Sequence, residues 1–208
     1  MRSLSYNNLG TVGAAALAPA LAANGSLTEL SIYGNGVGDE GVGAICEAIQ
    51  NNKETKLTSL NFRYNDIGPV GANAVAAMVA VTGSLTKMSL AVNKLEEEGT
   101  KAICEALEQN KTLKELDISG GDSGSNIGGL AGAKHVAKML GVNGGLAELS
   151  IYGNRVGDEG VGAICEAIQN NKETKLTSLN FGLNGIGPVG ANAVAAMVAV
   201  TGSLTKIE

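Results

Sequence analysis

The chain has 208 residues, of which 44% are hydrophobic and 17% are charged, and its formal net charge is −5. This composition is too apolar for a disordered chain, and the negative balance gives no electrostatic basis for binding nucleic acid or an anionic membrane. No run of the sequence approaches the roughly 20 apolar residues that a membrane span needs. With 30 glycines and no tryptophan, we expect a core of small and aliphatic side chains in thin, regular layers.

The first 25 residues, MRSLSYNNLGTVGAAALAPALAANG, allow two interpretations. The early Arg2, the apolar middle and the small residues near its end resemble a secretory signal peptide. However, residues 3–30 align without a gap with residues 61–88, which places Asn7 on Asn65. We therefore expect a structural repeat whose first strand is clipped, and not a signal peptide.

A segment of about 30 residues recurs along the chain. Each copy follows L-x-x-L-x-L-x-x-N-x-L, as in LTELSIYGNGV, and the alternating leucines indicate a strand. The period then changes, because Val42, Ile45, Cys46 and Ile49 lie at i, i+3, i+4 and i+7, on one face of a helix. The copies start at Leu27, Leu57, Leu85, Leu113, Leu146, Leu176 and Leu204.

One strand–turn–helix unit cannot bury its own apolar face, so the units must stack. Stacking predicts an α/β solenoid of about seven repeats, with a parallel β-sheet on the concave face and α-helices on the convex face. An asparagine recurs where each strand ends, and its amide can both donate to and accept from buried backbone groups. We predict that these side chains bridge successive turns as a ladder. They are Asn35, Asn65, Asn93, Asn126, Asn154 and Asn184.

The stretch GNGVGDEG contains G-x-G-x-x-G at Gly36, Gly38 and Gly41, which also occurs in dinucleotide-binding proteins. A later copy of the same stretch carries Arg155 in place of Gly36, so the first glycine of that motif is dispensable. We interpret the shared glycines as residues that allow tight turns and a close approach of strand and helix. No nucleotide site is predicted.

Residues 27–87 and 146–206 are a duplicated block, shifted by 119 positions. The two copies differ at five positions: Thr28/Ala147, Gly36/Arg155, Arg63/Gly182, Tyr64/Leu183 and Asp66/Gly185. Five extra residues between Ile118 and Asn126 indicate a loop on the rim of the solenoid, and residues 119–125 are an alternative binding surface.

Candidate catalytic and metal-binding residues are few. Cys46, Cys104 and Cys165 occupy the same helix position in alternate repeats, roughly 10 Å or more apart, beyond the about 7 Å Cα separation of a disulfide. We interpret them as small buried hydrophobic residues with free thiols, which are typical of proteins in a reducing compartment. The single histidine, His135, is expected on the surface of an outer helix. We therefore predict no catalytic residue, no metal site and no cofactor.

The 28- and 30-residue steps, with LTELSIYGNGVGDEGVGAICEAI and LKELDIS, resemble the ribonuclease-inhibitor-like class of leucine-rich repeats over the whole chain. That class also occurs in nucleotide-binding immune receptors and in the GTPase-activating protein of Ran. The resemblance implies a horseshoe that is usually intracellular, hence cytoplasmic here, and that binds other proteins through its concave sheet or rims.

The ends of the chain lack the polar caps that terminal repeats of solenoids normally carry. We expect residues 1–208 to be one leucine-rich repeat domain, a fragment of a longer protein that lacks both caps. Bare ends would expose apolar surface and strand edges. End-to-end self-association is therefore a further prediction.

Residues between the inward leucines should face the concave surface and bind a partner protein. A solvated sheet face whose copies have drifted after duplication is the alternative. We expect a non-catalytic interaction scaffold, without nucleic acid or membrane partners; the alternative function is a GTPase-activating regulator that positions its partner. The candidate partner-binding residues are Glu29, Tyr33, Asn61, Arg63, Lys87, Asp117 and Tyr152.

Overall fold

The computed structural model describes residues 4–121 and 124–208. Within them, seven helices alternate with seven short strands. The helices are α1 (Gly10–Ala23), α2 (Gly38–Asn51), α3 (Pro69–Val81), α4 (Glu96–Glu108), α5 (Gly129–Leu140), α6 (Gly157–Asn170) and α7 (Pro188–Val200). The strands are β1 (Glu29–Ser31), β2 (Ser59–Asn61), β3 (Lys87–Ser89), β4 (Glu115–Asp117), β5 (Glu148–Ser150), β6 (Ser178–Asn180) and β7 (Lys206–Ile207).

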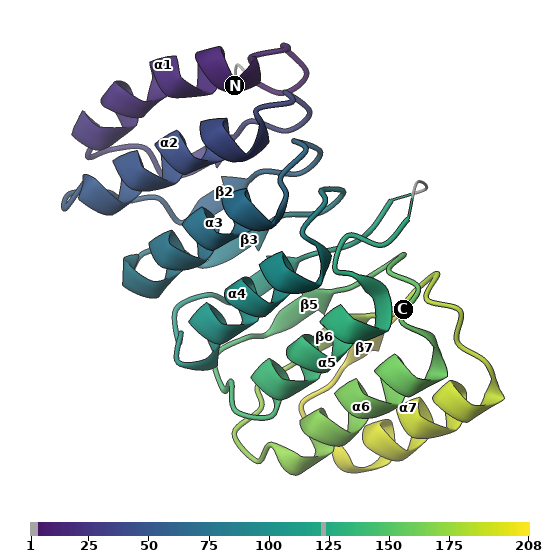
Figure 1. The fold of residues 1–208 in the computed structure, drawn as a ribbon. Helices are drawn as coiled ribbons and strands as arrows, with labels where there is room; N and C mark the ends of the chain where they lie inside the picture. Colours follow the sequence, from purple (N-terminus) through teal and green to yellow (C-terminus); the bar gives the residue numbers. More distant parts are fainter. Residues whose placement is uncertain (1–3, 122–123) are drawn as a thin grey trace.

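The strands form one parallel sheet in chain order from β1 to β7, and the helices stack in the same order on one side of it (Figure 1). The register repeats without a slip, with Leu30 beside Leu60 and Leu60 beside Met88. Helices that follow one another in the chain are in contact, from α1 and α2 to α6 and α7. This arrangement confirms the predicted α/β leucine-rich repeat solenoid.

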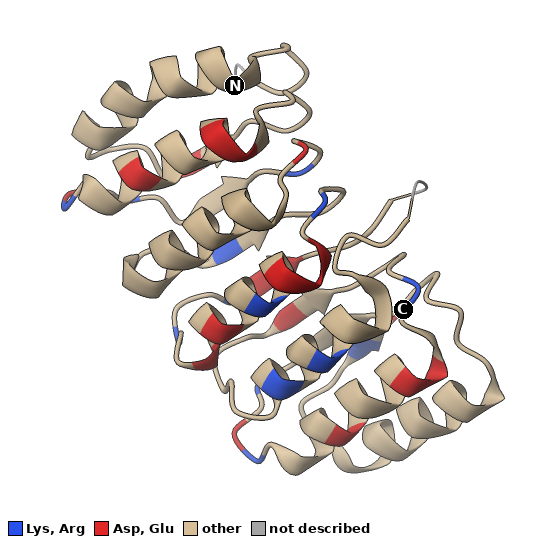
Figure 2. Ribbon diagram, viewed as in Figure 1, with Lys and Arg blue, Asp and Glu red and all other residues tan. Residues whose placement is uncertain are grey.

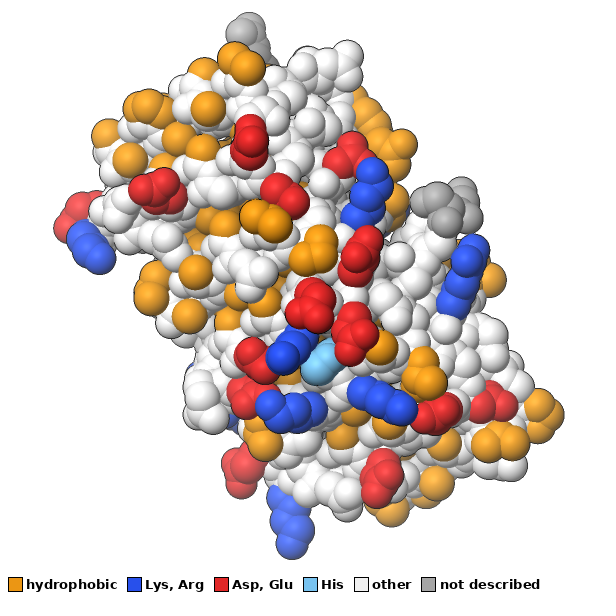
Figure 3. All heavy atoms as spheres, in the orientation of Figure 1, with side chains coloured by type: hydrophobic (Ala, Val, Ile, Leu, Met, Phe, Trp, Pro, Cys, Tyr) orange, Lys and Arg blue, Asp and Glu red, His pale blue; other side chains and the backbone are white. Residues whose placement is uncertain are grey.

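The convex surface carries its charges unevenly. In Figure 2, α1, α3 and α7 bear no charged residue, whereas α4 carries glutamates and a lysine and α5 carries lysines. His135 on α5 lies beside Glu97 of α4, with Nε2 3.6 Å from Oε1, and its side chain is 25% exposed, so the predicted surface position is correct. Figure 3 shows this histidine within a cluster of acidic and basic side chains.

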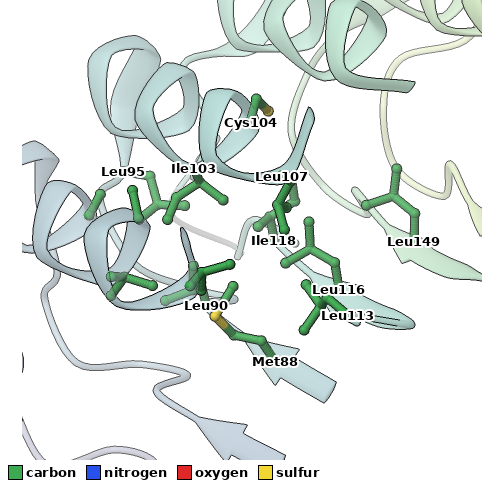
Figure 4. Packing of buried hydrophobic residues seen from close by; sticks show 14 of the residues in the cluster. Met88, Leu90, Leu95, Ile103, Cys104, Leu107, Leu113, Leu116, Ile118 and Leu149 are labelled. Carbon is green, nitrogen blue, oxygen red and sulfur yellow. The ribbon is translucent and has the colours of Figure 1, made fainter. Parts of the chain in front are cut away.

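The core lies between the sheet and the helices, and Figure 4 shows one of its layers. Leu90, which follows β3, packs with Ile103 and Leu107 of α4, and all three are at most 1% exposed. Cys104 in the same layer is free and buried, as are Cys46 and Cys165. Burial raises the pKa of the Cys104 thiol to about 12 and that of Cys165 to about 11, so both stay protonated at neutral pH.

The predicted asparagine ladder is present, and Asn65 illustrates it. Its Nδ2 donates to the carbonyls of Ile32 and Phe62 at 3.0 and 3.1 Å. Its Oδ1 accepts the Asn35 backbone N–H at 3.1 Å, and its own backbone N–H donates to Asn93 Oδ1 at 2.9 Å. The ladder thus satisfies backbone groups that would otherwise be buried without partners. The same bridge joins Asn126 to Asn154 and Asn154 to Asn184.

A second row of asparagines lies at the opposite ends of the helices and was not predicted. Asn52 donates from Nδ2 to the carbonyls of Leu21 and Asn24, both at 2.7 Å. Asn171 bridges the carbonyls of Leu140 and Asn143 in the same way, at 2.6 and 2.8 Å. Each of these asparagine side chains donates to carbonyl groups at the end of the helix in the preceding repeat, and so caps that helix.

The glycines of the G-x-G-x-x-G stretch serve the backbone. Gly38 has a φ of +64°, which only glycine adopts without strain. A Cβ on Gly41 would lie 2.9 Å from the Cβ of Ala14, so the close approach is mainly to the preceding helix α1 and not, as predicted, to the strand. Asp39 beside them accepts the backbone N–H of Gly68 at 2.6 Å and so links two repeats.

Candidate functional site

The concave face of the sheet encloses a hollow of about 1050 Å³. Its floor consists of the strand side chains that alternate with the buried leucines, because successive residues of a strand point to opposite faces. Tyrosines and an arginine from the turns also line the hollow. We call this lined hollow the concave surface.

Two tyrosines and an arginine form the most prominent feature of the concave surface. The Tyr6 and Tyr33 rings lie with centroids 4.6 Å apart at an interplanar angle of 60°, and the Tyr6 hydroxyl donates a hydrogen bond to the Tyr33 hydroxyl. The guanidinium carbon of Arg63 lies 5.8 Å from the centroid of the Tyr33 ring, within the range of a cation–π interaction. We call these three residues the Tyr–Arg cluster.

The backbone brings Tyr6 to Tyr33 through one glycine. Gly34 has a φ of +69°, and a Cβ there would lie 2.7 Å from the Tyr6 ring. Tyr6 itself has a φ of +56°, which an L-residue other than glycine rarely adopts, and its backbone N–H donates to the Tyr33 carbonyl at 2.9 Å. The contact therefore needs both the turn geometry and a residue without a side chain at position 34.

Arg63 extends across the sheet toward Asp117, which lies two strands away on β4. The distance from Nη1 to Oδ2 is 3.9 Å, which is too long for a hydrogen bond. The Asp117 carboxylate is held instead by Ser119, whose N–H and hydroxyl donate to Oδ1 at 3.1 and 2.5 Å, and by Ser89, whose hydroxyl donates to Oδ2 at 3.0 Å. Donors of Arg63 thus remain available to a partner.

The two tyrosine hydroxyls differ in acidity because they share one hydrogen bond. The bond donated by Tyr6 lowers the pKa of Tyr33, and the nearby Arg63 guanidinium lowers it further. The same bond raises the pKa of Tyr6, whose proton it engages. Tyr33 is therefore the hydroxyl of this pair that more readily donates a hydrogen bond or loses its proton.

The floor of the concave surface carries paired charges. Lys87 Nζ lies 2.5 Å from Glu115 Oε2, and this bond is the main reason that the pKa of Lys87 is raised. Glu148, next to Glu115 in the register of the sheet, and Glu29 add to that shift. The floor therefore presents both signs of charge.

The structure gathers six of the seven candidate residues on the concave surface. Tyr33, Asn61, Arg63, Lys87, Asp117 and Tyr152 all line the hollow. Glu29 is exposed on β1 but does not line it. The amide oxygen of Asn61 accepts the Arg63 backbone N–H at 3.0 Å, so part of its role is structural.

Tyr6 and Glu208 also line the hollow and were not among the candidates. Tyr6 could have been found, because the alignment of residues 3–30 with residues 61–88 places it on Tyr64, beside the arginine already selected. Glu208 accepts from Asn180 Nδ2 at 2.6 Å and pairs with Lys206 at 2.6 Å. No local sequence pattern indicates that Asn180, Lys206 and Glu208 interact.

The alternative surface, residues 119–125, is only partly visible, since residues 122 and 123 lie outside the described part of the chain. Gly121 and Gly124 bridge each other, with N–H to O distances of 3.2 and 3.1 Å. The Ser119 hydroxyl is engaged within the sheet by Asp117 and lies 2.8 Å from the Ser150 hydroxyl. This surface stays a prediction.

Within residues 4–121 and 124–208, no group of three or more His, Cys, Asp or Glu side chains could hold a metal ion. No helix among these residues has the length and apolar character to cross a bilayer.

Known proteins with similar sequences share this repeat architecture. A model of the Leucine Rich repeat family matches residues 3–18, 23–46, 53–76, 146–165 and 172–195, together just over half of the chain. Ribonuclease inhibitor from Sus scrofa is 29% identical over 189 residues, which cover 90% of this chain and 40% of that protein. NACHT, LRR and PYD domains-containing protein 12 from Mus musculus is 25% identical and covers 97% of this chain and 24% of that protein.

These curated relatives support the ribonuclease-inhibitor-like class, and the chain spans less than half of their length. Two solved structures share the fold. Leiomodin-1 actin-binding site 2 superposes with a TM-score of 0.55 at 23% identity, over 76% of this chain and 87% of that one. The tropomodulin C-terminal domain from Caenorhabditis elegans gives a TM-score of 0.59 at 16% identity, over 78% and 93%.

Proposed function

Because the chain belongs to the leucine-rich repeat family, we propose that it is a non-catalytic recognition domain that binds a folded partner protein through the concave surface. Two of the similar proteins are named for a protein that they bind or inhibit: ribonuclease inhibitor and the actin-binding site 2 of leiomodin-1. We do not assign ribonuclease or actin to this chain as its partner.

The observation that carries the proposal is the Tyr–Arg cluster. Tyrosine and arginine are enriched among residues that contribute most binding energy at protein interfaces. Tyr33 is held by Tyr6 on one side and covered by Arg63 on the other, so little side-chain entropy remains to be lost when a partner binds. A preorganised aromatic and cationic anchor beside a hollow is typical of an interaction surface.

Two further features support a partner protein in a reducing compartment such as the cytoplasm. The net charge of −5 disfavours nucleic acid and anionic membranes as partners. The three buried free thiols are compatible with a compartment in which disulfides do not form. We infer a cytoplasmic protein on this basis.

The test is a binding measurement with matched tyrosine variants. The immobilised chain captures partners from an extract of its source cells, and the affinity of each purified partner is then measured for Tyr33→Ala, Arg63→Ala and Tyr152→Ala. We expect the first two to weaken binding by about thirtyfold or more, as anchor residues do. Tyr152→Ala, at the same position of the second copy but without an arginine beside it, should weaken it by less than about threefold.

Unchanged affinity in both Tyr33→Ala and Arg63→Ala would reject the concave surface as the binding site. If Tyr152→Ala lowered the affinity as much as Tyr33→Ala, the Tyr–Arg cluster would not be the centre of the binding site. The alternative function, a regulator of a GTPase, stays a prediction of the family resemblance. Its test is the rate of GTP hydrolysis by candidate GTPases with and without the chain.

A further inference from the structure

The same asparagine lies on the concave surface in both copies of the duplicated block. Asn61 on β2 and Asn180 on β6 correspond at the shift of 119 residues. In each copy the side-chain Oδ1 accepts the backbone N–H two residues later, from Arg63 at 3.0 Å and from Gly182 at 2.9 Å. This bond identifies the other end of each amide as the NH2 group. In both copies, Nδ2 is therefore the donor that remains for another partner.

In the second copy, a carboxylate accepts from this donor. Asn180 Nδ2 donates to Glu208 Oε2 at 2.6 Å, and Lys206 Nζ lies 2.6 Å from Oε1 of the same carboxylate. Lys206, and to a smaller extent Asn180, lower the pKa of Glu208. The structure thus contains one example of a side-chain carboxylate that an asparagine and a cation bind together on this face of the sheet.

A serine stands in the first copy where the second has this glutamate. Ser89 on β3 corresponds to Glu208 at the same shift of 119 residues. The two residues take the same place in the sheet. The Phe62 N–H donates to the Ser89 carbonyl at 2.9 Å, and the Phe181 N–H donates to the Glu208 carbonyl at 2.8 Å. The two copies therefore differ in the side chain at this position and not in the backbone around it.

The serine does not replace the glutamate as an acceptor. The Ser89 hydroxyl donates to Asp117 Oδ2 on β4 at 3.0 Å. Over residues 4–121 and 124–208, Asn61 Nδ2 has no acceptor within hydrogen-bond distance. The first copy therefore presents an amide donor above a short side chain, where the second copy holds a carboxylate.

The cation beside this position is also different in the first copy. Lys87, the counterpart of Lys206, pairs with Glu115 on β4 at 2.5 Å. Arg63, which the second copy lacks, brings a guanidinium instead. Its side chain is 41% exposed, and its Nη1 lies 3.9 Å from Asp117 Oδ2. A guanidinium donates in a planar fork that matches the two oxygens of a carboxylate.

The charges around the arginine favour a ligand group with a single negative charge. Arg63 and Lys87 lie beside Asp117 and Glu115, so the formal charges of this part of the sheet balance. A carboxylate adds one negative charge, whereas a phosphate group adds about −1.5 to −2 at neutral pH. The two acidic side chains would repel the phosphate more strongly.

We propose that the first copy of the block binds the carboxylate of an aspartate or glutamate side chain of the partner protein. That carboxylate accepts hydrogen bonds from Asn61 Nδ2 and from the Arg63 guanidinium above Ser89, as Glu208 accepts from Asn180 in the second copy. The inference rests on the proposed function, because it names the chemistry that the arginine of the Tyr–Arg cluster recognises on the partner.

The first experiment uses the chain alone with small probes at constant ionic strength. NMR follows the side-chain signals of Asn61 and Arg63. The α-amide of N-acetyl-glutamate should shift both signals in a saturable way, and the α-amide of N-acetyl-glutamine, which is uncharged, should shift neither. The same response to both probes, or to neither, would overturn the proposal. So would tighter binding of inorganic phosphate, or of N-acetyl-glycine, whose carboxylate is that of a chain end.

Matched variants test the two donors, each through the signal of the other. Arg63→Gly installs the residue of the second copy, and Asn61→Asp keeps the Oδ1 acceptor but removes the NH2 group. Each should weaken binding of the glutamate probe by about fivefold or more, because each removes a hydrogen bond to a charged group. Asn180→Asp makes the same change in the second copy and should leave the affinity within about twofold of the wild type. An unchanged affinity in both Arg63→Gly and Asn61→Asp, or an equal loss in Asn180→Asp, would contradict the proposed site.

A further variant supplies the carboxylate from within the chain. Ser89→Glu installs the residue of position 208. The Asn61 amide signals should shift as the introduced carboxyl ionises. The pKa of that carboxyl should be lower than in the double variant with Arg63→Gly, because a nearby guanidinium favours the charged form. If the amide signals did not respond and the two pKa values agreed, this position would not bind a carboxylate.

Replacements in a captured partner distinguish this proposal from the proposed function. Its surface aspartates and glutamates are changed one at a time to asparagine and glutamine. One change should weaken binding to the wild type by about tenfold or more and have no further effect on binding to Arg63→Gly. If binding depends on Tyr33 and Arg63 but no acidic residue of the partner is coupled to Arg63, the carboxylate proposal fails and the proposed function stands. If the glutamate probe binds as expected but Tyr33→Ala and Arg63→Ala leave the partner's affinity unchanged, the proposed function fails and the carboxylate site stands.

Discussion

The two copies of the duplicated block show how the same sequence acquires different surroundings. Residues 27–87 and 146–206 differ at five positions, and the backbone geometry of the two copies agrees closely, with φ of +59° at Gly36 and +56° at Arg155. Their surfaces do not agree. The first copy carries Tyr33 and Arg63 of the Tyr–Arg cluster, and its second helix, α3, is covered by α4. The second copy carries Tyr152 with Gly182 in place of the arginine, and its second helix, α7, is open.

The difference between Arg63 and Gly182 accompanies a difference in the orientation of the neighbouring tyrosine ring. In the second copy, a Cβ on Gly182 would lie 2.8 Å from Cδ2 of Tyr152, so the ring rests over the glycine. In the first copy the equivalent residue is Arg63, and the Tyr33 ring contacts Tyr6 of the preceding repeat instead. A similar difference removes an ion pair, since Asp66 binds Lys94 at 2.7 Å and Gly185 replaces it in the second copy.

The comparison teaches that a repeat obtains its stability from its neighbours. Because contacts in a solenoid run only between adjacent repeats, an internal repeat has two interfaces and a terminal repeat has one. Identical substitutions in the two copies should therefore have unequal effects, and this is open to measurement in urea at concentrations where the chain is monomeric.

The largest difference is expected at the asparagine ladder. Asn65→Ala leaves the buried backbone N–H of Asn35 without its acceptor and removes one of the two amide donors to each of the carbonyls of Ile32 and Phe62. The change should lower the free energy of unfolding by about 3 kcal/mol. Asn184→Ala removes an equivalent set of bonds, but the last repeat can fray alone, so about 1–2 kcal/mol is expected. Equal losses would contradict the role of the neighbours.

The next difference is expected in the helices of identical sequence. Val75→Ala creates a cavity at a position that is 0% exposed, and should cost about 2 kcal/mol. Val194→Ala, at the same position of α7, removes a side chain that is only partly buried and should cost less than about 1 kcal/mol. If Val194→Ala cost as much as Val75→Ala, α7 would have to be covered in solution.

A smaller effect, of opposite sign in the two copies, is expected at the divergent turn. Arg155 has a φ of +56°, so Arg155→Gly should stabilise the chain by about 1 kcal/mol. Gly36→Arg introduces the same strain into the first copy and should destabilise it by a similar amount, about 1 kcal/mol. Thermal unfolding of the two variants measures both changes, and a stabilised Gly36→Arg would contradict this account of the turn.

The smallest effect concerns the acidity of Tyr33. Tyr6→Phe removes the hydrogen bond that is the main cause of the lowered pKa of Tyr33, so that pKa should rise toward its ordinary value. Arg63→Gly, which copies the residue of the second block, should raise it by less. Absorbance of tyrosinate during an alkaline titration records both shifts. A pKa of Tyr33 that falls in Tyr6→Phe would refute the hydrogen-bond direction.

Much of the fold and part of the site followed from the sequence. The alternating leucines and the helical period predicted the repeat, and the position of Asn65 predicted its bridging bonds, because both patterns recur within each unit. The second asparagine row was missed because Asn52 acts on Leu21, 31 residues away, in a turn with no fixed local motif. Tyr6 was missed for a similar reason, since its partner Tyr33 lies 27 residues along the chain.

What the sequence determined by itself was the repeat, its number of copies and the backbone role of the asparagines that follow its strands. These follow from the periodicity of apolar residues and from bonds that every unit must make. The tertiary structure alone decided which copy of PVGANAVAAMVAV is buried and which tyrosine meets an arginine. Burial of a repeat depends on what is stacked against it, and identical sequences carry no record of their neighbours.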